Sequence, residues 1–363
     1  MKYLFATLIF IHGAIHLMGF LKAFNLAQLE QMNAGISKIS GIVWLLVFVL
    51  FMAIGIAFLA KAEWWFWLGI VAAAISTVLI IMVWKDARFG TIANIIIVVV
   101  AVLAFGSVRF ENQFKKDVND NLRWTNTLPT EILTATDLQP LPEPVQRYLK
   151  YSGVVNKPKV KNVRVVFEGK MREKGKDWFP FTTLQYNFFD EPARLFFMKA
   201  KMFGVTVPGY HRYSKATATM DIRLFGLLSV INIAGESMNK TETVTLFNDM
   251  CLIAPATLLD KRIEWKAIDS ATAEAVFTNR GISIEAVLYF NPAGQLINFT
   301  SDDRTAVSDM KQYRFSTPVS EYKTINGSNI MTYGETVWHY PDGEFVYGKF
   351  KLKEIKYNVN KLE

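Results

Sequence analysis

Residues 89–108 read FGTIANIIIVVVAVLAFGSV, and this stretch divides the chain into two chemically different parts. It is 20 residues long, and its polar side chains, Thr91, Asn94 and Ser107, fall near its two ends. A helix of about 20 apolar residues crosses the roughly 30 Å hydrocarbon core of a bilayer. The stretch therefore predicts a transmembrane helix that ends a membrane domain comprising residues 1–108.

Three further apolar segments precede this helix, at residues 3–21, 41–59 and 64–83. Together the segments predict a bundle of four transmembrane helices. Residues 22–40 are mixed in character, and apolar side chains recur there at helical spacing, at Leu26, Leu29, Met32 and Ile36. This stretch predicts either an amphipathic helix that lies at the membrane interface or a simple connecting helix.

Four polar residues of the membrane domain are candidates for function. His12 and His16 are four residues apart and share one helix face. Ionisable groups inside a membrane are costly and often functional, so the pair could ligate a cofactor or relay protons. The alternative is a pair of neutral imidazoles that bond to neighbouring helices. Asp86, in a short charged turn, and Asn94, inside the last span, complete this set.

The charge and the rare residue types exclude several functions. Six of the 40 basic and three of the 32 acidic residues fall in residues 1–108, which leaves a net charge of +5 on residues 109–363. No concentrated basic stripe is present, so nucleic-acid binding is not predicted. One cysteine and four histidines offer little material for a metal centre. We predict no metal and no cofactor.

The distribution of Lys and Arg indicates the sidedness of the chain. Four spans place both termini on the same side of the membrane. The side away from the termini holds four basic residues, against two on the terminal side, or six if the stretch after the last span is counted. Because long domains translocate largely regardless of charge, we expect the large C-terminal domain outside the cytoplasm.

The rest of the chain has the pattern of an antiparallel β protein. Residues 109–144 predict a stalk and linker, and residues 145–363 a β-rich domain. From residue 159 onward apolar residues alternate with polar ones, and turn signals follow at Asn291–Gly294 and Pro341–Gly343. The short connections predict about ten antiparallel strands.

One helix interrupts the strands. Residues 239–259 place apolar side chains at three- and four-residue steps, at Val244, Phe247, Cys251, Ala254 and Leu258. Asn239 and Glu242 fit a capping box at its start, and Pro255 should kink the helix or begin a second one. The predicted fold is therefore a membrane α-helical bundle followed by an α+β domain, in which a curved antiparallel sheet packs on a central helix.

Aromatic residues and methionines are dense between residues 179 and 213. They form either an ordinary β core or an apolar cavity for a lipid-like ligand, since curved sheets can enclose one. The candidate cavity residues are Phe181, Tyr186, Phe188, Phe197, Met202, Phe247 and Cys251.

The sequence offers few candidates for catalysis. The run Ser301–Arg304 has paired carboxylates beside an arginine, which is suited to acid–base work but is also typical of a solvated strand end. His211 and His339 have no second histidine or cysteine nearby. No glycine-rich phosphate loop, G-x-S-x-G or H-E-x-x-H motif is present. We predict no catalytic residue.

Several segments resemble a family of bacterial multi-pass membrane proteins of unknown function. They are HGAIHLMGFLKAF (residues 12–24), WKDARFGTIAN (84–94), LPEPVQRYLKYSGV (141–154), residues 235–259, IEWKAID (263–269) and ETVWHYPDGEFVYG (335–348). The resemblance implies a bacterial cell membrane and brings no known activity. The order of strands and helix is also similar to the half-barrel of envelope lipoprotein carriers, in which an incomplete barrel holds acyl chains.

Three functions remain open from the sequence. The first is a membrane-anchored, non-enzymatic protein whose β-rich domain binds an apolar or lipid-like ligand, or an envelope partner. The second is a membrane-embedded redox or proton-handling enzyme centred on His12 and His16. The third is a scaffold or sensor. The lipid bilayer is the partner that all three share.

Overall fold

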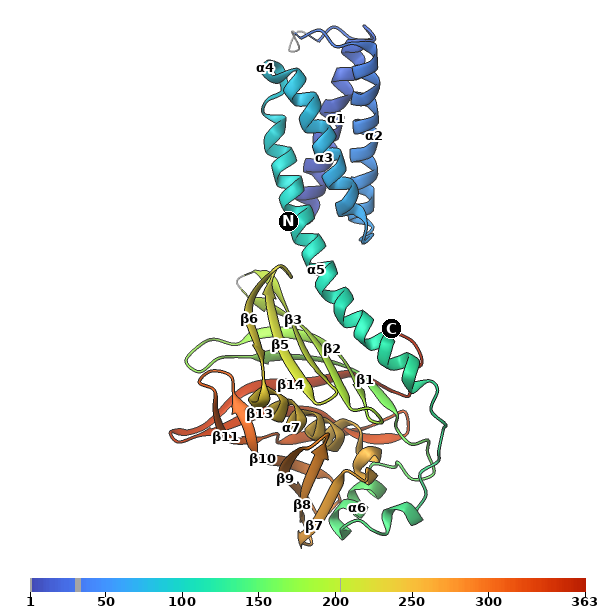
Figure 1. Ribbon diagram of the computed structural model, residues 1–363, viewed down its shortest axis with the longest axis vertical. Helices are drawn as coiled ribbons and strands as arrows, with labels where there is room; N and C mark the ends of the chain where they lie inside the picture. The colour runs from blue at the N-terminus through green and yellow to red at the C-terminus, as the bar shows by residue number, and fades with distance from the viewer. Residues whose placement is uncertain (1, 30–33, 203) are drawn as a thin grey trace. The chain divides into compact units, whose positions relative to one another are not determined.

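The computed structural model describes residues 2–29, 34–202 and 204–363. The chain divides into two compact units, Met1–Phe110 and Glu111–Glu363. We call them the helical unit and the β-rich unit, and each is described by itself (Figure 1).

The helical unit is built from long apolar helices. Its elements are α1 (Lys2–Ala23), α2 (Lys38–Leu59), α3 (Trp65–Met82), the short α4 (Trp84–Ala87) and the first part of α5 (Gly90–Thr125). Among the described residues, α1, α2, α3 and α5 are long and apolar enough to cross a membrane. The predicted set of four apolar helices is therefore confirmed.

Close packing of α1 on α2 depends on glycine. A Cβ atom at Gly19 would lie 2.2 Å from the Trp44 ring, and one at Gly13 would lie 2.8 Å from Cβ of Phe51. Small residues at such positions let two helices approach closely, which favours association in a lipid environment.

The helix predicted over residues 22–40 is wrong for the described part of this stretch. α1 ends at Ala23, and residues 24–29 and 34–37 form turns and irregular structure. Asn25 adopts a left-handed conformation with φ of 53°, and the amide of Leu26 donates to the carbonyl of Leu21, so the helix is closed there. Ser37 then caps α2 by accepting from the amide of Ser40. Met32 lies outside the described residues.

The described residues of the β-rich unit form a 14-stranded sheet in which every pairing is antiparallel. Its first meander consists of β1 (Asn162–Met171), β2 (Phe179–Phe188), β3 (Ala193–Met202), β4 (Val205–Ser214), β5 (Thr217–Leu224) and β6 (Leu228–Ala234). Its second consists of β7 (Ile263–Asp269), β8 (Thr272–Asn279), β9 (Ile282–Phe290), β10 (Leu296–Ala306), β11 (Lys311–Ser316), β12 (Val319–Ile325), β13 (Ser328–Tyr340) and β14 (Gly343–Tyr357).

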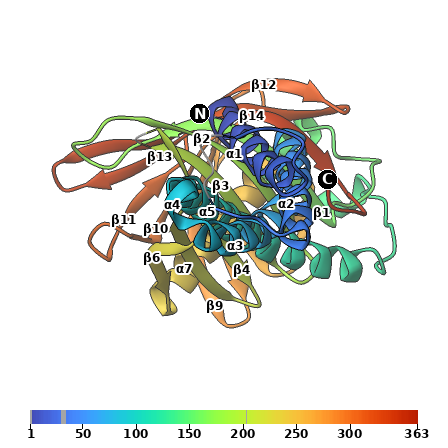
Figure 2. The ribbon, with the colours of Figure 1, turned by 90° about the horizontal axis from the view of Figure 1, so that it is seen from above.

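The two meanders join where β1 pairs with β14, so the first and last strands are neighbours. At this junction a Cβ atom on Gly169 would lie 2.0 Å from the carbonyl oxygen of Lys349, so only glycine fits. The far edges of the sheet are β6 and β7. Figure 2 shows β12 and β14 on one side of this unit and β9 on the other.

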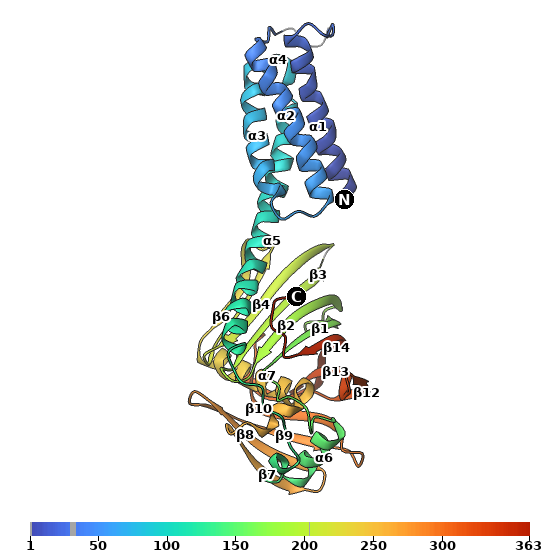
Figure 3. The ribbon, with the colours of Figure 1, turned by 90° about the vertical axis from the view of Figure 1, so that its right-hand side faces the viewer.

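The helix α7 (Glu236–Ile253) connects the two edge strands and lies within the curve of the sheet (Figures 1 and 3). The short 3₁₀ helix η2 (Pro255–Leu259) follows it and begins at Pro255, as expected for a residue that cannot continue an α-helix. The 3₁₀ helix η1 (Thr136–Leu138) and α6 (Glu143–Tyr151) precede β1. A curved antiparallel sheet packed on a central helix is therefore confirmed.

The predicted capping box at the start of this helix is wrong. The helix begins three residues earlier, after Gly235. The side chain of Asn239 accepts from the amide of Ala218 on β5, at 2.7 Å, and Glu242 turns to an arginine of the sheet. Both capping side chains are thus used for contacts between α7 and the sheet.

The strands β2–β4 contact helices on both faces. We call the face toward α7 the inner face. On the outer face, the part of α5 that belongs to the β-rich unit packs through Phe114, whose ring lies 5.4 Å from that of Phe197 and 5.5 Å from that of Tyr210. Asp117 of the same helix accepts hydrogen bonds from Tyr210 and Arg212, at 2.8 and 3.1 Å.

Candidate functional site

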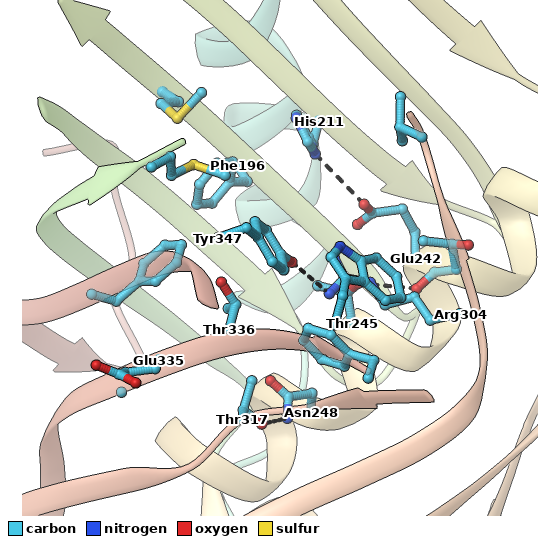
Figure 4. Close-up of a pocket in the computed structure, with 18 of the residues that line it drawn as sticks. Phe196, His211, Glu242, Thr245, Asn248, Arg304, Thr317, Glu335, Thr336 and Tyr347 are labelled. Atoms are coloured by element: carbon cyan, nitrogen blue, oxygen red, sulfur yellow. Dashed lines mark hydrogen bonds and ion pairs between the residues drawn. The ribbon is translucent and has the colours of Figure 1, made fainter. Parts of the chain in front are cut away.

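A cavity of about 610 Å³ lies between the inner face of the sheet and α7 (Figure 4). Both meanders contribute to its wall. Its apolar lining includes Phe167, Phe196, Met198, Met220, Ile231, Met238, Leu252, Phe315, Val319, Met331, Trp338 and Phe350. The side chains of Arg194, His211, Glu242, Asp249 and Arg304 add a charged group to the same wall.

The charged group is centred on Arg194 of β3. This side chain is buried, and its Nε donates to Oδ2 of Asp249 at 2.7 Å, while Nη1 donates to Oε2 of Glu242 at 3.2 Å. Gln185 and Asn187 of β2 also donate to Oδ2 of Asp249, at 2.6 and 3.0 Å. A buried charge is tolerated when it is paired and hydrogen-bonded, and this group meets both conditions.

Glu242 is the most deeply buried acid of the group, at 2 % exposure. Burial alone would raise the pKa of its carboxyl, but Arg194, His211 and Arg304 together outweigh that effect and lower the pKa to about 2. Nδ1 of His211 lies 3.6 Å from Oε1 of Glu242, and Figure 4 shows the two side chains pointing toward one another. Glu242 is therefore an anion at neutral pH.

Arg304 of β10 forms the second polar feature of the wall. Its guanidinium carbon lies 4.0 Å from the centre of the Phe315 ring and 5.3 Å from that of Trp338, and its Nη1 donates to the Tyr347 hydroxyl at 2.9 Å. Its Nε is buried and has no hydrogen-bond partner among the described residues. A buried N–H without an acceptor is costly, so this atom is suited to bind an acceptor on a ligand.

The arrangement favours binding rather than bond making. A long apolar wall meets a compact polar group, which suits a molecule with an apolar chain and one polar end. In the part of the chain that the structure describes, no group of three or more His, Cys, Asp or Glu side chains is placed to hold a metal ion.

None of the seven residues predicted to form an apolar cavity lines this one. Tyr186, Phe188 and Phe197 lie on the outer face of the sheet, and Tyr186 and Phe197 pack on Phe114 of α5. Phe181 and Met202 lie on the inner face, beyond the lining. Two lie on α7: Phe247 stacks on Phe277 of β8, and Cys251 is fully buried, with its carbonyl accepting from Tyr148.

A few of the apolar lining residues that sequence reasoning missed are next to predicted ones. Phe196 and Met198 flank Phe197 on β3, and successive strand residues point to opposite faces. The alternation of side chains along a strand separates Phe197 from Phe196 and Met198, but around these residues both faces of β3 are buried, so apolar side chains occur on both. Arg194 and Glu242 are 48 residues apart in the sequence, and no local signal connects them.

The polar candidates of the helical unit form a buried network across three helices. Nε2 of His12 donates to the Asn94 side-chain oxygen at 2.8 Å, and the Ser76 hydroxyl lies 2.8 Å from Nε2 of His16. Nδ1 of His16 lies 2.8 Å from the carbonyl oxygen of His12, and Nδ2 of Asn94 donates to Ser76 and Thr77 at 2.9 and 3.0 Å. The structure thus brings His12, His16 and Asn94 together.

Asp86 is not part of this network. Its Oδ2 accepts from the backbone amide of Ala34 at 2.8 Å, in the connection between α1 and α2. In the β-rich unit, Asp302 pairs with Arg314 and Asp303 with Lys240, at 2.9 and 2.6 Å. Of the run Ser301–Arg304, only Arg304 lines the cavity.

Comparison with known proteins identifies the family. A model of a family of unknown function, DUF6544, matches residues 131–350. The chain belongs to this family. The predicted resemblance to a family of unknown function is confirmed by this match. No curated protein matches the chain significantly.

Among solved structures, the crystal structure of a LolA superfamily protein from Nitrosomonas europaea is similar to the chain. The similarity covers 59 % of this chain and 94 % of that protein, with 11 % identity and a TM-score of 0.37.

The Glu242 carboxylate makes a testable contribution to stability. Its pKa is lowered from 4.5 to about 2 on folding, so its contribution is complete above pH 4.5 and is lost as the pH falls toward 2. The shift corresponds to about 3 kcal/mol. We expect Glu242→Gln to flatten the acid-induced loss of stability, measured by urea unfolding at a series of pH values. Glu264→Gln, at an exposed position of β7, is the matched control, and an unchanged slope in Glu242→Gln would contradict the assignment.

The hydrogen-bond network of the helical unit should contribute to the stability of that unit. Asn94→Ala removes one hydrogen-bond partner each of His12, Ser76 and Thr77 and should destabilise the unit by about 1–2 kcal/mol. Thermal unfolding in detergent measures this change. Thr91→Ala, which removes a hydroxyl bonded to the Arg88 carbonyl within the same segment, is the control and should have a smaller effect.

Proposed function

We propose that the chain is a membrane-anchored, non-enzymatic protein whose β-rich unit binds a lipid-like molecule in the cavity between the sheet and α7. The four apolar helices provide the anchor. The apolar chain of the ligand lies along the methionines and aromatic rings of the inner face, and its polar end lies at Arg304, near His211 and Glu242.

The cavity itself is the observation that carries the proposal. Its volume of about 610 Å³ falls within the roughly 300–1,000 Å³ of typical small-molecule pockets. Most of its wall is apolar, and methionines such as Met198, Met220 and Met331 adapt their shape to a flexible chain. The unpaired Nε of Arg304 supplies a donor for one acceptor atom.

The alternative of a redox or proton-handling enzyme at His12 and His16 has weaker support. Both ring nitrogens of His16 and Nε2 of His12 already lie within hydrogen-bond distance of neighbouring groups. Binding a cofactor through these atoms would break hydrogen bonds that connect three helices. The arrangement favours a structural role in which the imidazoles hold the bundle together.

Filling the cavity tests ligand binding. Met198→Trp replaces a flexible thioether in the lining with a bulky indole ring. It should weaken the affinity for a fluorescent acyl probe by roughly tenfold or more, which corresponds to a loss of about 1.4 kcal/mol in binding free energy. Thr182→Trp is the matched control, because Thr182 is exposed on the outer face of the neighbouring strand β2. The full chain in lipid nanodiscs is titrated with the probe. Equal uptake by the two variants, or no uptake by the wild type, would contradict the proposal.

We also propose that the β-rich unit lies outside the cytoplasm. The charge count without the stretch after the last span supports this side. A reporter that is active only outside the cytoplasm, fused after Glu363, should be active, and a cytoplasm-only reporter at the same position should be silent. The reverse pattern would place the unit and its ligand inside the cell.

A further inference from the structure

One end of the β-rich unit presents exposed apolar side chains. Residues 225–227 connect β5 to β6, and here Leu227, Leu228 and Val230 are 37 %, 65 % and 59 % exposed. Lys201, which is exposed, pairs in register with Thr206 where β3 ends and β4 begins. An apolar tip beside a basic side chain is typical of a segment that lies in a membrane interface.

Contacts of α5 within the β-rich unit show at which end of the sheet this helix enters the unit. Asp117 bonds to Arg212, at 3.1 Å, and Glu111 forms an ion pair with Lys199, at 2.6 Å. Lys199 is paired in register with Pro208 of β4. Moving back along α5 from Asp117 to Glu111, the contacts therefore move along β4 toward its first residue, Val205.

The sequence places Glu111 close to the bilayer. Two residues separate it from Val108, where the predicted span ends, and a helix rises roughly 1.5 Å per residue, or about 5 Å over this interval. The last residue of β3, Met202, lies three residues beyond Lys199, about 10 Å further along the strand. The end of the unit with the exposed apolar residues is thus the end at which α5 enters the β-rich unit.

We propose that the β5–β6 turn, together with Lys201, docks on the surface of the bilayer in which the chain is anchored, and that anionic lipid is its partner. The proposal rests on the membrane anchoring proposed above. On the inner face, Met220 and Ile231 line the cavity, and the half-buried Ile222 and Leu224 continue from there to the turn. The docked turn therefore gives a lipid an apolar path into the cavity.

A fluorescent label on the turn tests the docking. Leu228→Cys in the full chain is labelled with an environment-sensitive maleimide and reconstituted into vesicles of phosphatidylcholine and phosphatidylglycerol that carry a shallow nitroxide quencher. Ile268→Cys is the matched control, because Ile268 is 51 % exposed on β7, the opposite edge strand of the sheet. Burial raises the pKa of the Cys251 thiol well above its ordinary value, so the native cysteine stays unlabelled.

We expect the label at residue 228 to be quenched several-fold more than the label at residue 268. Equal quenching overturns the proposal, and so does a blue-shifted but unquenched label at residue 228, which would indicate that a second copy of the chain covers this surface. Acyl-probe uptake by the same samples separates the two proposals. Quenching without uptake supports docking and contradicts the proposed ligand binding, whereas uptake without quenching does the opposite.

Discussion

The ion pairs of Arg194 with Glu242 and Asp249 fix α7 on the inner face of the sheet. All three side chains lie in the space between β3 and the helix, with Arg194 and Glu242 at 7 % and 2 % exposure. A displacement of the helix along the sheet would leave a buried charge without its partner, at a cost of several kcal/mol. The position of α7, and therefore the space left beside it, depends on this contact.

The path of the chain explains why that space exists. α7 connects β6 to β7, the two edges of the sheet, while β1 and β14 pair at its centre. The sheet therefore curls around the helix. On one side, Phe247 of α7 packs on Phe277 and Phe299, with ring centres 5.3 and 5.9 Å apart. On the other side, the polar and smaller side chains of Thr245 and Asn248 line the cavity, and Asn248 donates to the Thr317 hydroxyl.

Much of the fold could be predicted because its signals are local. Runs of about 20 apolar residues identify the four long helices, and alternation identifies the strands. The predictions were wrong where a side chain that fits a local pattern binds a residue distant in the sequence instead. Asn239 and Glu242 match a capping box, but Asn239 bonds to the backbone of Ala218, and Glu242 pairs with Arg194. The spacing of apolar residues after Ala23 predicted a helix, but the chain turns at Asn25, which has a positive φ.

The sequence by itself determined the four apolar helices, the antiparallel sheet, the central helix and the family. Only the tertiary structure decided which aromatic residues line the cavity. Strand alternation shows that Phe196 and Phe197 face opposite sides, but it does not show which side faces α7. Around residues 195–198 both faces of β3 are covered, by α7 and by α5, so both carry apolar side chains there and the usual contrast between a buried and a solvated face is absent. The partners of Arg194 lie 48 and 55 residues away and meet it only in the folded unit.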